Sequence, residues 1–208
     1  MIDFKEHPWI VKLALIVISF LSGAGIIGAA WGIGSQAVLQ VLEHQTENLE
    51  NFHNFTASVS SVVDGDTIKV YIDGQLDTEE TLRLIGVDTP ETVHPALPVQ
   101  FFGPEATAFT KLMCENKKVR LFLPKAGDMR GRYGRLLVYV ELENKQILNE
   151  QIIVQGFGYS YTKYPHEKTK LYNELERQAR NAKRGLWASV KFEDLPEWLR
   201  IANPDILK

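Results

Sequence analysis

The pattern of apolar and polar positions changes character along the chain. Positions 13–33 carry no charged residue, and a helix of about 21 residues would run roughly 31 Å, the thickness of a bilayer's hydrocarbon core. From position 57 the apolar residues come in short runs separated by Asp-Gly turns, which is typical of strands. Later segments carry apolar residues at helical spacing. The sequence therefore predicts a membrane-spanning helix followed by an α+β domain.

Five strands and about three helices are expected in that domain. The predicted strands cover residues 59–63, 68–72, 81–87, 119–123 and 135–142. One helix begins at Pro104, because a missing N–H is tolerated in the first turn of a helix. The others cover about 149–155 and about 167–182, with Gly185 as a carboxyl cap of the last helix. Five strands with interposed helices fit a small Greek-key β-barrel.

The hydrophobic segment 13–33 has two interpretations. As a retained single-pass anchor it would leave the flank 1–12 in the cytoplasm, since Lys5 and Lys12 precede the segment and the first charges after it are acidic. The domain would then be extracytoplasmic. As a secretory signal it would be cleaved after the small residues 28–30. The uncharged run is longer than a usual signal core, which favours the anchor.

The remaining segments outside the domain are a stalk, 34–54, and a helical tail, 191–208. The stalk carries a short heptad-like stripe, and small residues recur every fourth position in the anchor, so both favour weak self-association. A monomeric linker behind a lipid-facing helix is the alternative. The apolar tail either packs on the barrel or lies on the membrane. The domain itself is expected to cover 55–190.

Composition narrows the functional classes. The chain is 45% hydrophobic and 24% charged, as expected for a globular protein. From position 55 onward it carries 21 basic and 21 acidic residues, which favours transient contact with nucleic acid over stable coating of it. The lone Cys114 excludes an internal disulfide, and with five scattered histidines it argues against a structural zinc site.

Five polar residues in a fixed order indicate phosphodiester chemistry. Asp66 and Asp88 offer the oxygen ligands that Ca²⁺ takes, and Glu91 could position or deprotonate a water molecule. Arg83 and Arg135 carry planar forks that match the oxygens of a phosphate. Because Arg83 lies in an apolar strand, a salt bridge to an acid, Asp64 or Asp88, is a second interpretation of it.

These residues lie in segments that resemble the thermonuclease (staphylococcal nuclease) family over roughly Thr56–Ser189. The matching segments, in the order and near the spacing of the family, are Val63–Thr67, Leu82–Thr92, Phe102–Ala106, Tyr133–Tyr139 and Gly185–Trp187. Any one of them is weak, because Asp-Gly-Asp-Thr is also an ordinary hairpin turn. Together they identify the chain as a member of this family.

The resemblance implies a fold, a cofactor and a reaction. It implies the OB fold for the barrel and a Ca²⁺ site in which the backbone carbonyl of Thr89 joins Asp66 and Asp88. It also implies that Glu91 accepts a proton from the attacking water or orients it. Cleavage of the bond to the 5′ oxygen would release 3′-phosphate ends.

The chain departs from the family pattern in two places. Tyr133 matches a substrate-contacting tyrosine and an ungapped count places another at Tyr164, but Thr162 falls where a third is expected, and the adjacent Tyr161 could replace it. Base stacking and core packing are equally good interpretations for one of these rings. The segment 95–101 has no lysine where the founding member has a basic loop. Both departures concern substrate affinity or preference.

The predicted function is a membrane-anchored, Ca²⁺-dependent nuclease that hydrolyses DNA with little sequence preference, and RNA stays open as a second substrate. The alternative is an OB-fold module that binds nucleic acid without cutting it. Such modules generally lose one of the acids or arginines, whereas this chain keeps all five. A membrane-tethered interaction scaffold is a third interpretation, which applies if the domain binds no nucleic acid.

Overall fold

A computed structural model describes most of the domain and its tail, namely residues 53–75, 78–93, 98–125 and 127–207. The predicted flank, membrane helix and nearly all of the stalk fall within residues 1–52, outside the described residues. Those three predictions stay predictions. Among the residues that the structure describes, no helix has the length and apolar character needed to cross a membrane.

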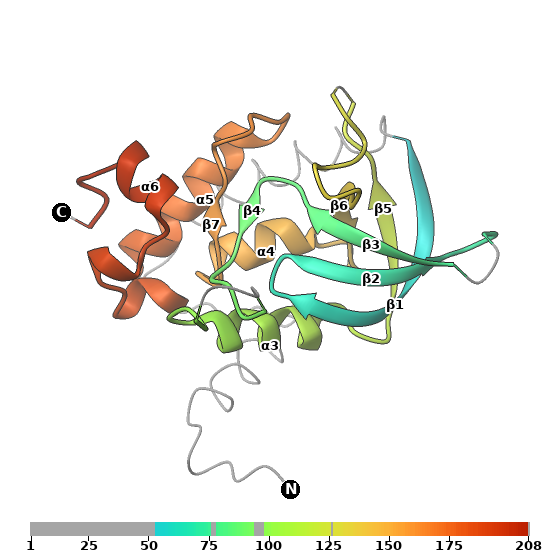
Figure 1. Cartoon of the computed structure of the whole chain (residues 1–208), viewed down its shortest axis with the longest axis horizontal. Helices are drawn as coiled ribbons and strands as arrows, with labels where there is room; N and C mark the ends of the chain where they lie inside the picture. Colours follow the sequence, from blue (N-terminus) through green and yellow to red (C-terminus); the bar gives the residue numbers. More distant parts are fainter. Residues whose placement is uncertain (1–52, 76–77, 94–97, 126, 208) are drawn as a thin grey trace, which may run out of the picture. The chain divides into compact units, whose positions relative to one another are not determined.

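Five strands close into a barrel, as the sequence predicts (Figure 1). They are β1 (Asn54–Asp64), β2 (Thr67–Ile72), β3 (Glu79–Leu84), β5 (Lys118–Phe122) and β6 (Leu136–Glu141). Their order around the barrel is β1-β2-β3-β6-β5, and β5 pairs back with β1. The β3–β6 pair is parallel, and the other neighbours are antiparallel. This closed barrel with helices fits an OB-type α+β fold.

The three predicted helices are present, and shorter ones follow them. They are α3 (Gly103–Cys114), α4 (Leu148–Val154), α5 (Thr169–Asn181), the 3-10 helices η1 (Gly185–Ala188) and η2 (Phe192–Asp194), and α6 (Glu197–Ala202). Helix α4 lies between β6 of the barrel and α5 (Figure 1). Because six of its seven residues are buried, α4 joins the barrel to the helical part of the molecule.

The predicted strand 81–87 is broken, and the break matters for the site. Strand β3 ends at Leu84, and Gly86 follows with φ 70°. A Cβ at Gly86 would lie 2.1 Å from Nε2 of His166, so only glycine fits this turn. The chain then forms the two-residue strand β4 (Val87–Asp88), which pairs with β7 (Tyr159–Ser160) outside the barrel. The turn therefore carries Asp88 off the barrel toward the helices.

The carboxyl cap predicted at Gly185 is wrong. Helix α5 ends at Asn181, and Lys183 takes the left-handed conformation there, with φ 51°. Gly185 instead permits a close backbone approach, since a Cβ on it would lie 2.2 Å from the carbonyl oxygen of Gly156. The Leu186 N–H donates to that same oxygen at 2.9 Å. Gly185 thus joins the end of the helical region to the loop before β7.

The tail packs on the protein. Its apolar residues Leu195, Leu199 and Ile206 are buried in a cluster with residues of β7, α5 and η1. The other members of this cluster are Tyr159, Ala179, Leu186 and Trp187. Of the two locations that the sequence allowed, the structure places the tail against the protein, on the helical side rather than on the barrel itself.

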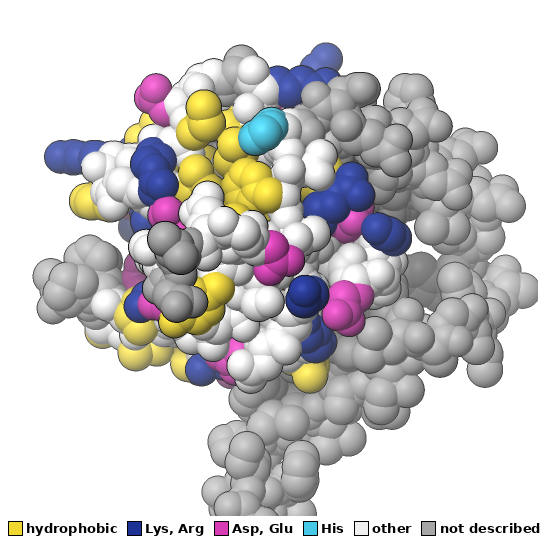
Figure 2. Space-filling view, turned by 90° about the vertical axis from the view of Figure 1, so that its right-hand side faces the viewer, with side chains coloured by type: hydrophobic (Ala, Val, Ile, Leu, Met, Phe, Trp, Pro, Cys, Tyr) yellow, Lys and Arg dark blue, Asp and Glu magenta, His cyan; other side chains and the backbone are white. Residues whose placement is uncertain are grey.

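Charges of both signs are interspersed on the barrel surface. Figure 2 looks at the molecule from its barrel side, and in the described part of this face the basic side chains lie beside acidic ones. The Lys69 ammonium is 2.8 Å from a Glu79 carboxylate oxygen, and the Arg130 guanidinium is 2.7 Å from Glu80. These pairs neutralise basic residues that would otherwise offer a platform for a polyanion.

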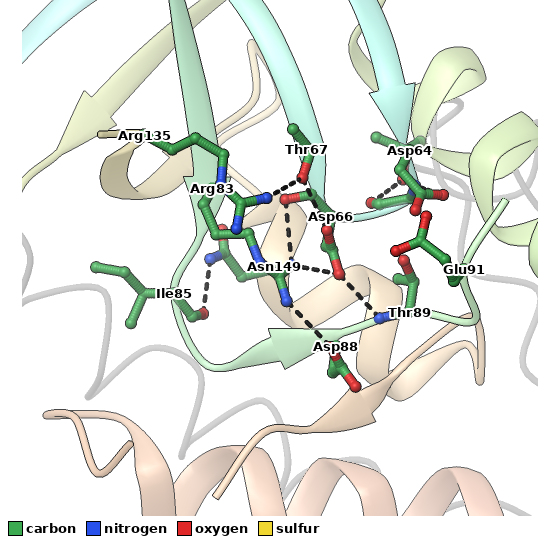
Figure 3. A network of polar contacts seen from close by, with 12 residues as sticks. Asp64, Asp66, Thr67, Arg83, Ile85, Asp88, Thr89, Glu91, Arg135 and Asn149 are labelled. Carbon is green, nitrogen blue, oxygen red and sulfur yellow. Dashed lines mark hydrogen bonds and ion pairs between the residues drawn. The ribbon is translucent and has the colours of Figure 1, made fainter. Parts of the chain in front are cut away.

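A buried amide ties the barrel to the turn that precedes β4 (Figure 3). Asn149 of α4 is fully buried, and its Oδ1 accepts the Val140 N–H at 3.0 Å. Its Nδ2 donates to the carbonyl oxygens of Ile85 and Val138, at 3.0 and 3.2 Å. Since Ile85 leads into the Gly86 turn, the position of Asp88 depends on this amide.

We expect Asn149→Leu to lower the free energy of unfolding by about 3 kcal/mol or more. The substitution preserves the size of the side chain but leaves the Val140 N–H and the Ile85 carbonyl without this partner, and each unsatisfied buried group costs about 1–3 kcal/mol. Urea unfolding of the full chain measures the change. The matched control is Asn181→Leu at an exposed position, for which a change within about 0.5 kcal/mol is expected. Equal stability of the two variants would contradict the assignment.

Candidate active site

The candidate site lies at one end of the barrel, where two turns meet (Figure 3). The β1–β2 turn is packed between α3 and the loop after β4. On the α3 side, the Thr110 hydroxyl donates to the Gly65 carbonyl at 2.7 Å. A Cβ at Gly65 would lie 2.7 Å from the Thr89 hydroxyl oxygen, so this turn and the loop after β4 are in close contact. Their contact brings Asp66 beside residues that follow β4.

Hydrogen bonds hold the Asp66 carboxylate from two directions. It is buried, its Oδ2 accepts the Thr89 N–H at 3.0 Å, and its Oδ1 accepts the Thr67 hydroxyl at 2.9 Å. Thr89, whose carbonyl is expected to join the metal ligands, is therefore adjacent to Asp66. The Thr89 hydroxyl oxygen is itself buried without a hydrogen-bond partner among the described residues.

Arg83 lies between the two predicted metal ligands. Its guanidinium forms an ion pair with Oδ2 of Asp66, and its Nη2 lies 3.1 Å from Oδ1 of Asp88. The sequence allowed a salt bridge to Asp64 or Asp88, and the structure shows Asp88 together with Asp66. One guanidinium thus holds two carboxylates that would otherwise repel each other.

The pKa shifts follow from this arrangement. Burial alone would lower the pKa of Arg83, but the charges of Asp66 and Asp88 outweigh it and raise the pKa. Burial raises the pKa of Asp88 to about 6, although the Arg83 charge opposes the shift. Arg83 therefore stays charged, and Asp88 is protonated more easily than an ordinary aspartate.

Asp64, which the sequence indicated as a turn residue and as a possible partner of Arg83, belongs to the same acidic group. Its Oδ1 accepts the Gly65 N–H at 2.9 Å and the hydroxyl groups of Thr92 and Thr107, at 2.8 and 3.1 Å. Burial and a hydrogen bond with Glu91 raise the pKa of Asp64. Asp64 and Glu91 thus lie side by side, as Figure 3 shows.

The Glu91 carboxylate is fixed by the backbone of its own loop. Its Oε1 accepts the N–H groups of Thr92 and Val93, at 3.1 and 3.0 Å. The Glu91 N–H donates to Oε1 of Gln100 at 2.9 Å, and the Gln100 N–H donates back to the Glu91 carbonyl at 2.9 Å. Gln100 was not singled out in the sequence, because a glutamine in a loop carries no motif signal.

Arg135 reaches the same turn from the strand on the other side. It immediately precedes β6, and its Nη1 donates to the Thr67 hydroxyl at 3.3 Å. Thr67 in turn donates to Asp66, so a chain of hydrogen bonds connects Arg135 to Asp66. Its guanidinium also lies 5.5 Å from the centre of the Tyr133 ring. The partner of this fork is a neutral hydroxyl, which a phosphate could replace at little cost.

The three predicted substrate-contacting tyrosines lie outside the core. Tyr133 and Tyr164 are 75% and 65% exposed, so core packing does not explain either ring. Tyr161 is half-buried, and its ring centre lies 5.7 Å from that of Tyr164 and 5.0 Å from that of Trp198. Contact of these rings with a substrate stays a prediction.

The donor set fits a hard divalent cation. Four carboxyl groups gather at this end of the barrel, from Asp64, Asp66, Asp88 and Glu91, and Arg83 is the cation paired with two of them. All are oxygen donors, which suit Ca²⁺ or Mg²⁺ rather than zinc. In the described part of the chain no three His, Cys, Asp or Glu side chains form a ready metal cluster. The ligand set that the family resemblance implies, namely Asp66, Asp88 and the Thr89 carbonyl, therefore stays a prediction.

One residue at the site came from a region that sequence reasoning left without a function. Nε1 of Trp198 in α6 donates to Oδ2 of Asp88 at 2.8 Å, across 110 positions of the chain. The sequence holds no local signal for such a contact, because it arises only when the tail packs on the helical region.

Comparisons with known proteins agree with this geometry. The family model described as "Staphylococcal nuclease homologue" matches residues 81–189, more than half of the chain. The chain belongs to this family. The thermonuclease of Staphylococcus hyicus is 40% identical over 146 residues, covering 70% of this chain and 83% of the relative. The resemblance inferred from the motifs is confirmed.

Other relatives have similar descriptions. The thermonuclease of Staphylococcus intermedius is 38% identical over 130 residues, covering 62% of this chain and 74% of the relative. The endonuclease YncB of Bacillus subtilis is 34% identical over 151 residues, covering 71% of this chain and 67% of the relative. The segment matched by the family model contains Arg83, Asp88, Glu91 and Arg135, whereas Trp198 lies beyond its end.

Proposed function

We propose that this protein is a nuclease that uses Ca²⁺ to hydrolyse phosphodiester bonds in DNA, with RNA as a second candidate substrate. The observation that carries the proposal is the convergence of two carboxylates paired with one guanidinium, a second guanidinium and a fixed glutamate at one end of the barrel. Relatives named thermonuclease and endonuclease support it.

Asp66 and Asp88 would hold the cation, together with the Thr89 carbonyl. When bound, Ca²⁺ would supply positive charge that polarises the phosphate. The protein's part is to keep the two carboxylates in place before the cation arrives. Thr67 and the Thr89 N–H orient Asp66, and Arg83 holds Asp66 and Asp88 near each other.

Glu91, Arg83 and Arg135 would act on the water and the phosphate. Two backbone N–H groups hold the Glu91 carboxylate, so it can position a water molecule or accept its proton. Arg83 and Arg135 can donate to phosphate oxygens as negative charge builds on them during water attack. Following the family resemblance, we propose cleavage of the bond to the 5′ oxygen, which leaves 3′-phosphate ends.

Substrate contact would come from a few exposed rings and cations rather than from a broad basic surface. Tyr133 and Tyr164 are exposed and offer stacking faces that any base can use. The loop that Gln100 joins to Glu91 presents apolar side chains, since Val99 is 60% and Phe101 38% exposed. Such contacts read no base edge, which supports cleavage with little sequence preference.

The rival function is a module that binds nucleic acid without cutting it. It would not require five catalytic-type side chains to meet at one point, whereas here all five do. The rival predicts binding of DNA in Ca²⁺ with no new phosphate ends. A cleavage assay with a chelator control separates the two functions.

We expect the purified full chain to cut single-stranded DNA in Ca²⁺ and to lose this activity in excess chelator. Asp66→Asn should remove most of the activity, because one of only two charged ligands is lost. Gel analysis of the products measures cutting, and resistance of their 3′ ends to extension before phosphatase treatment tests the expected 3′ phosphate. The control Asp128→Asn changes an exposed acid. Full activity in chelator would refute the cofactor assignment.

Replacing Arg135 by Lys should lower turnover at least about a hundredfold. A lysine offers a point charge instead of a two-pronged fork, and one lost transition-state donor is worth roughly 3 kcal/mol. The same loss is expected for Arg83→Lys, with some loss of stability because Arg83 also holds two carboxylates. Arg132→Lys, on an exposed neighbour of Tyr133, is the matched control. Near-normal turnover in Arg135→Lys would show that the Arg135 fork is not required for catalysis and that its role is structural.

We further propose that residues 13–33 anchor the protein and that the domain faces away from the cytoplasm. The support is the uncharged run itself and the basic residues that precede it. Protease treatment of intact cells, combined with carbonate extraction of their membranes, should digest the domain of a membrane-held chain from outside. A soluble product beginning near Trp31 would identify a cleaved signal instead. If the protease digests the domain only after the cells are lysed, the domain faces the cytoplasm and the proposed orientation is wrong.

A further inference from the structure

The carboxyl-terminal tail, described over residues 191–207, reaches the candidate metal site. Trp198 of α6 donates its indole N–H to Oδ2 of Asp88 at 2.8 Å. Its ring also meets Tyr161 edge to face, with centres 5.0 Å apart and planes at 75°. A residue beyond the segment that the family model matches thus contacts a proposed metal ligand directly.

The Asp88 carboxylate needs hydrogen-bond donors to orient it, because the backbone around Asp88 does little to fix its position. It ends the two-residue strand β4, which is paired only with β7 in a small sheet outside the barrel. The terminal torsion of an aspartate is broad, so the carboxylate plane is not set by rotamer preference. Arg83 donates to Oδ1 at 3.1 Å and Trp198 to Oδ2 at 2.8 Å, and donors on both oxygens fix that plane.

These two hydrogen bonds leave room for a cation. An ionised carboxylate has about four lone-pair sites on its two oxygens, and the two donors occupy one site on each oxygen. The indole N–H is a donor only, so it stabilises the charged form of the carboxylate that a cation requires. The contact is therefore compatible with metal binding on the remaining lone pairs.

The indole itself is held in place by the packing of the tail. Trp198 packs against the cluster that contains Leu195, Leu199 and Ile206, and this cluster also includes Trp187 of η1. The donor is thus fixed by buried apolar contacts around it rather than by a mobile loop. Such preorganisation is what a group that orients a metal ligand requires.

We propose that Trp198 is a positioning residue that orients Asp88 for the divalent cation, so that the tail forms part of the metal site. This inference rests on the proposed function, because it presupposes a cation at Asp66 and Asp88. Partners that hydrogen-bond to metal-ligating side chains typically contribute about 10- to 100-fold to metal affinity or activity. Trp198 would therefore affect the cation affinity rather than the maximal rate.

The test compares Trp198→Phe with Trp187→Phe in the full chain. Phenylalanine keeps an aromatic ring at position 198 but has no N–H to donate to Asp88. Trp187 lies in the same cluster, and its buried Nε1 has no hydrogen-bond partner among the described residues. Trp187→Phe therefore removes packing without removing a hydrogen bond. Calorimetric titration with Ca²⁺ in the absence of nucleic acid gives the dissociation constants, and thermal unfolding in chelator gives the stability of each variant.

Trp198→Phe should raise the Ca²⁺ dissociation constant about tenfold or more, while Trp187→Phe leaves it within about twofold. Cleavage by Trp198→Phe should return close to the wild-type rate at saturating Ca²⁺. An unchanged dissociation constant in Trp198→Phe would show that the contact is only structural. Tighter binding would show that the tail obstructs the site, and would equally overturn the proposal.

The experiment also separates this inference from the proposed function. A wild-type chain that binds no Ca²⁺ would overturn both the cofactor assignment and the proposed task of Trp198. A wild-type chain that binds Ca²⁺ and cuts DNA, beside a Trp198→Phe variant of equal affinity, would overturn the inference alone. An affinity loss in Trp187→Phe equal to that in Trp198→Phe would assign the effect to tail packing and reject the hydrogen bond as its cause.

Discussion

The site depends on one half-buried guanidinium, that of Arg83, which holds two carboxylates. Asp66 comes from the β1–β2 turn and Asp88 from a strand outside the barrel, and Arg83 of β3 pairs with both. Without the positive charge of Arg83, the ionised carboxylates of Asp66 and Asp88 would repel each other. Burial would also make the ionised form of each carboxylate less favourable. The other contacts refine an arrangement that this triad sets. Thr89 and Thr67 orient Asp66, and Arg135 joins the group through Thr67.

Asp66, Arg83 and Asp88 can meet because the chain leaves the barrel after β3. Gly86 turns the chain off β3, so Asp88 pairs with β7 and faces the helical region rather than a barrel neighbour. Asn149 fixes the start of that turn from α4. The same turn places Asp88 beside the tail, where the indole N–H of Trp198 donates to it. Barrel, α4 and tail therefore all contribute to the position of one carboxylate.

The predictable features are those with local signals. Short apolar runs separated by turns predicted the five barrel strands, and Pro104 predicted the start of α3. The motif residues Asp66, Arg83 and Asp88 lie together in the structure, while their functions stay predictions. The break between β3 and β4 was missed, because a glycine in an apolar run reveals its conformation only through its packing against His166. The Trp198 contact was missed for a similar reason, since no pattern relates residues 110 positions apart. The predicted membrane segment lies outside the described residues and stays a prediction.

The central claim is that Asp66 and Asp88, held by Arg83, form the site of a divalent cation. A crystal of the protein grown with Ca²⁺ and a nucleotide tests it most directly, through the anomalous signal of the metal. The account predicts one peak within about 2.3–2.6 Å of a carboxylate oxygen of both Asp66 and Asp88. A metal bound to neither residue, or no metal in a crystal whose protein cuts DNA in Ca²⁺, would contradict it.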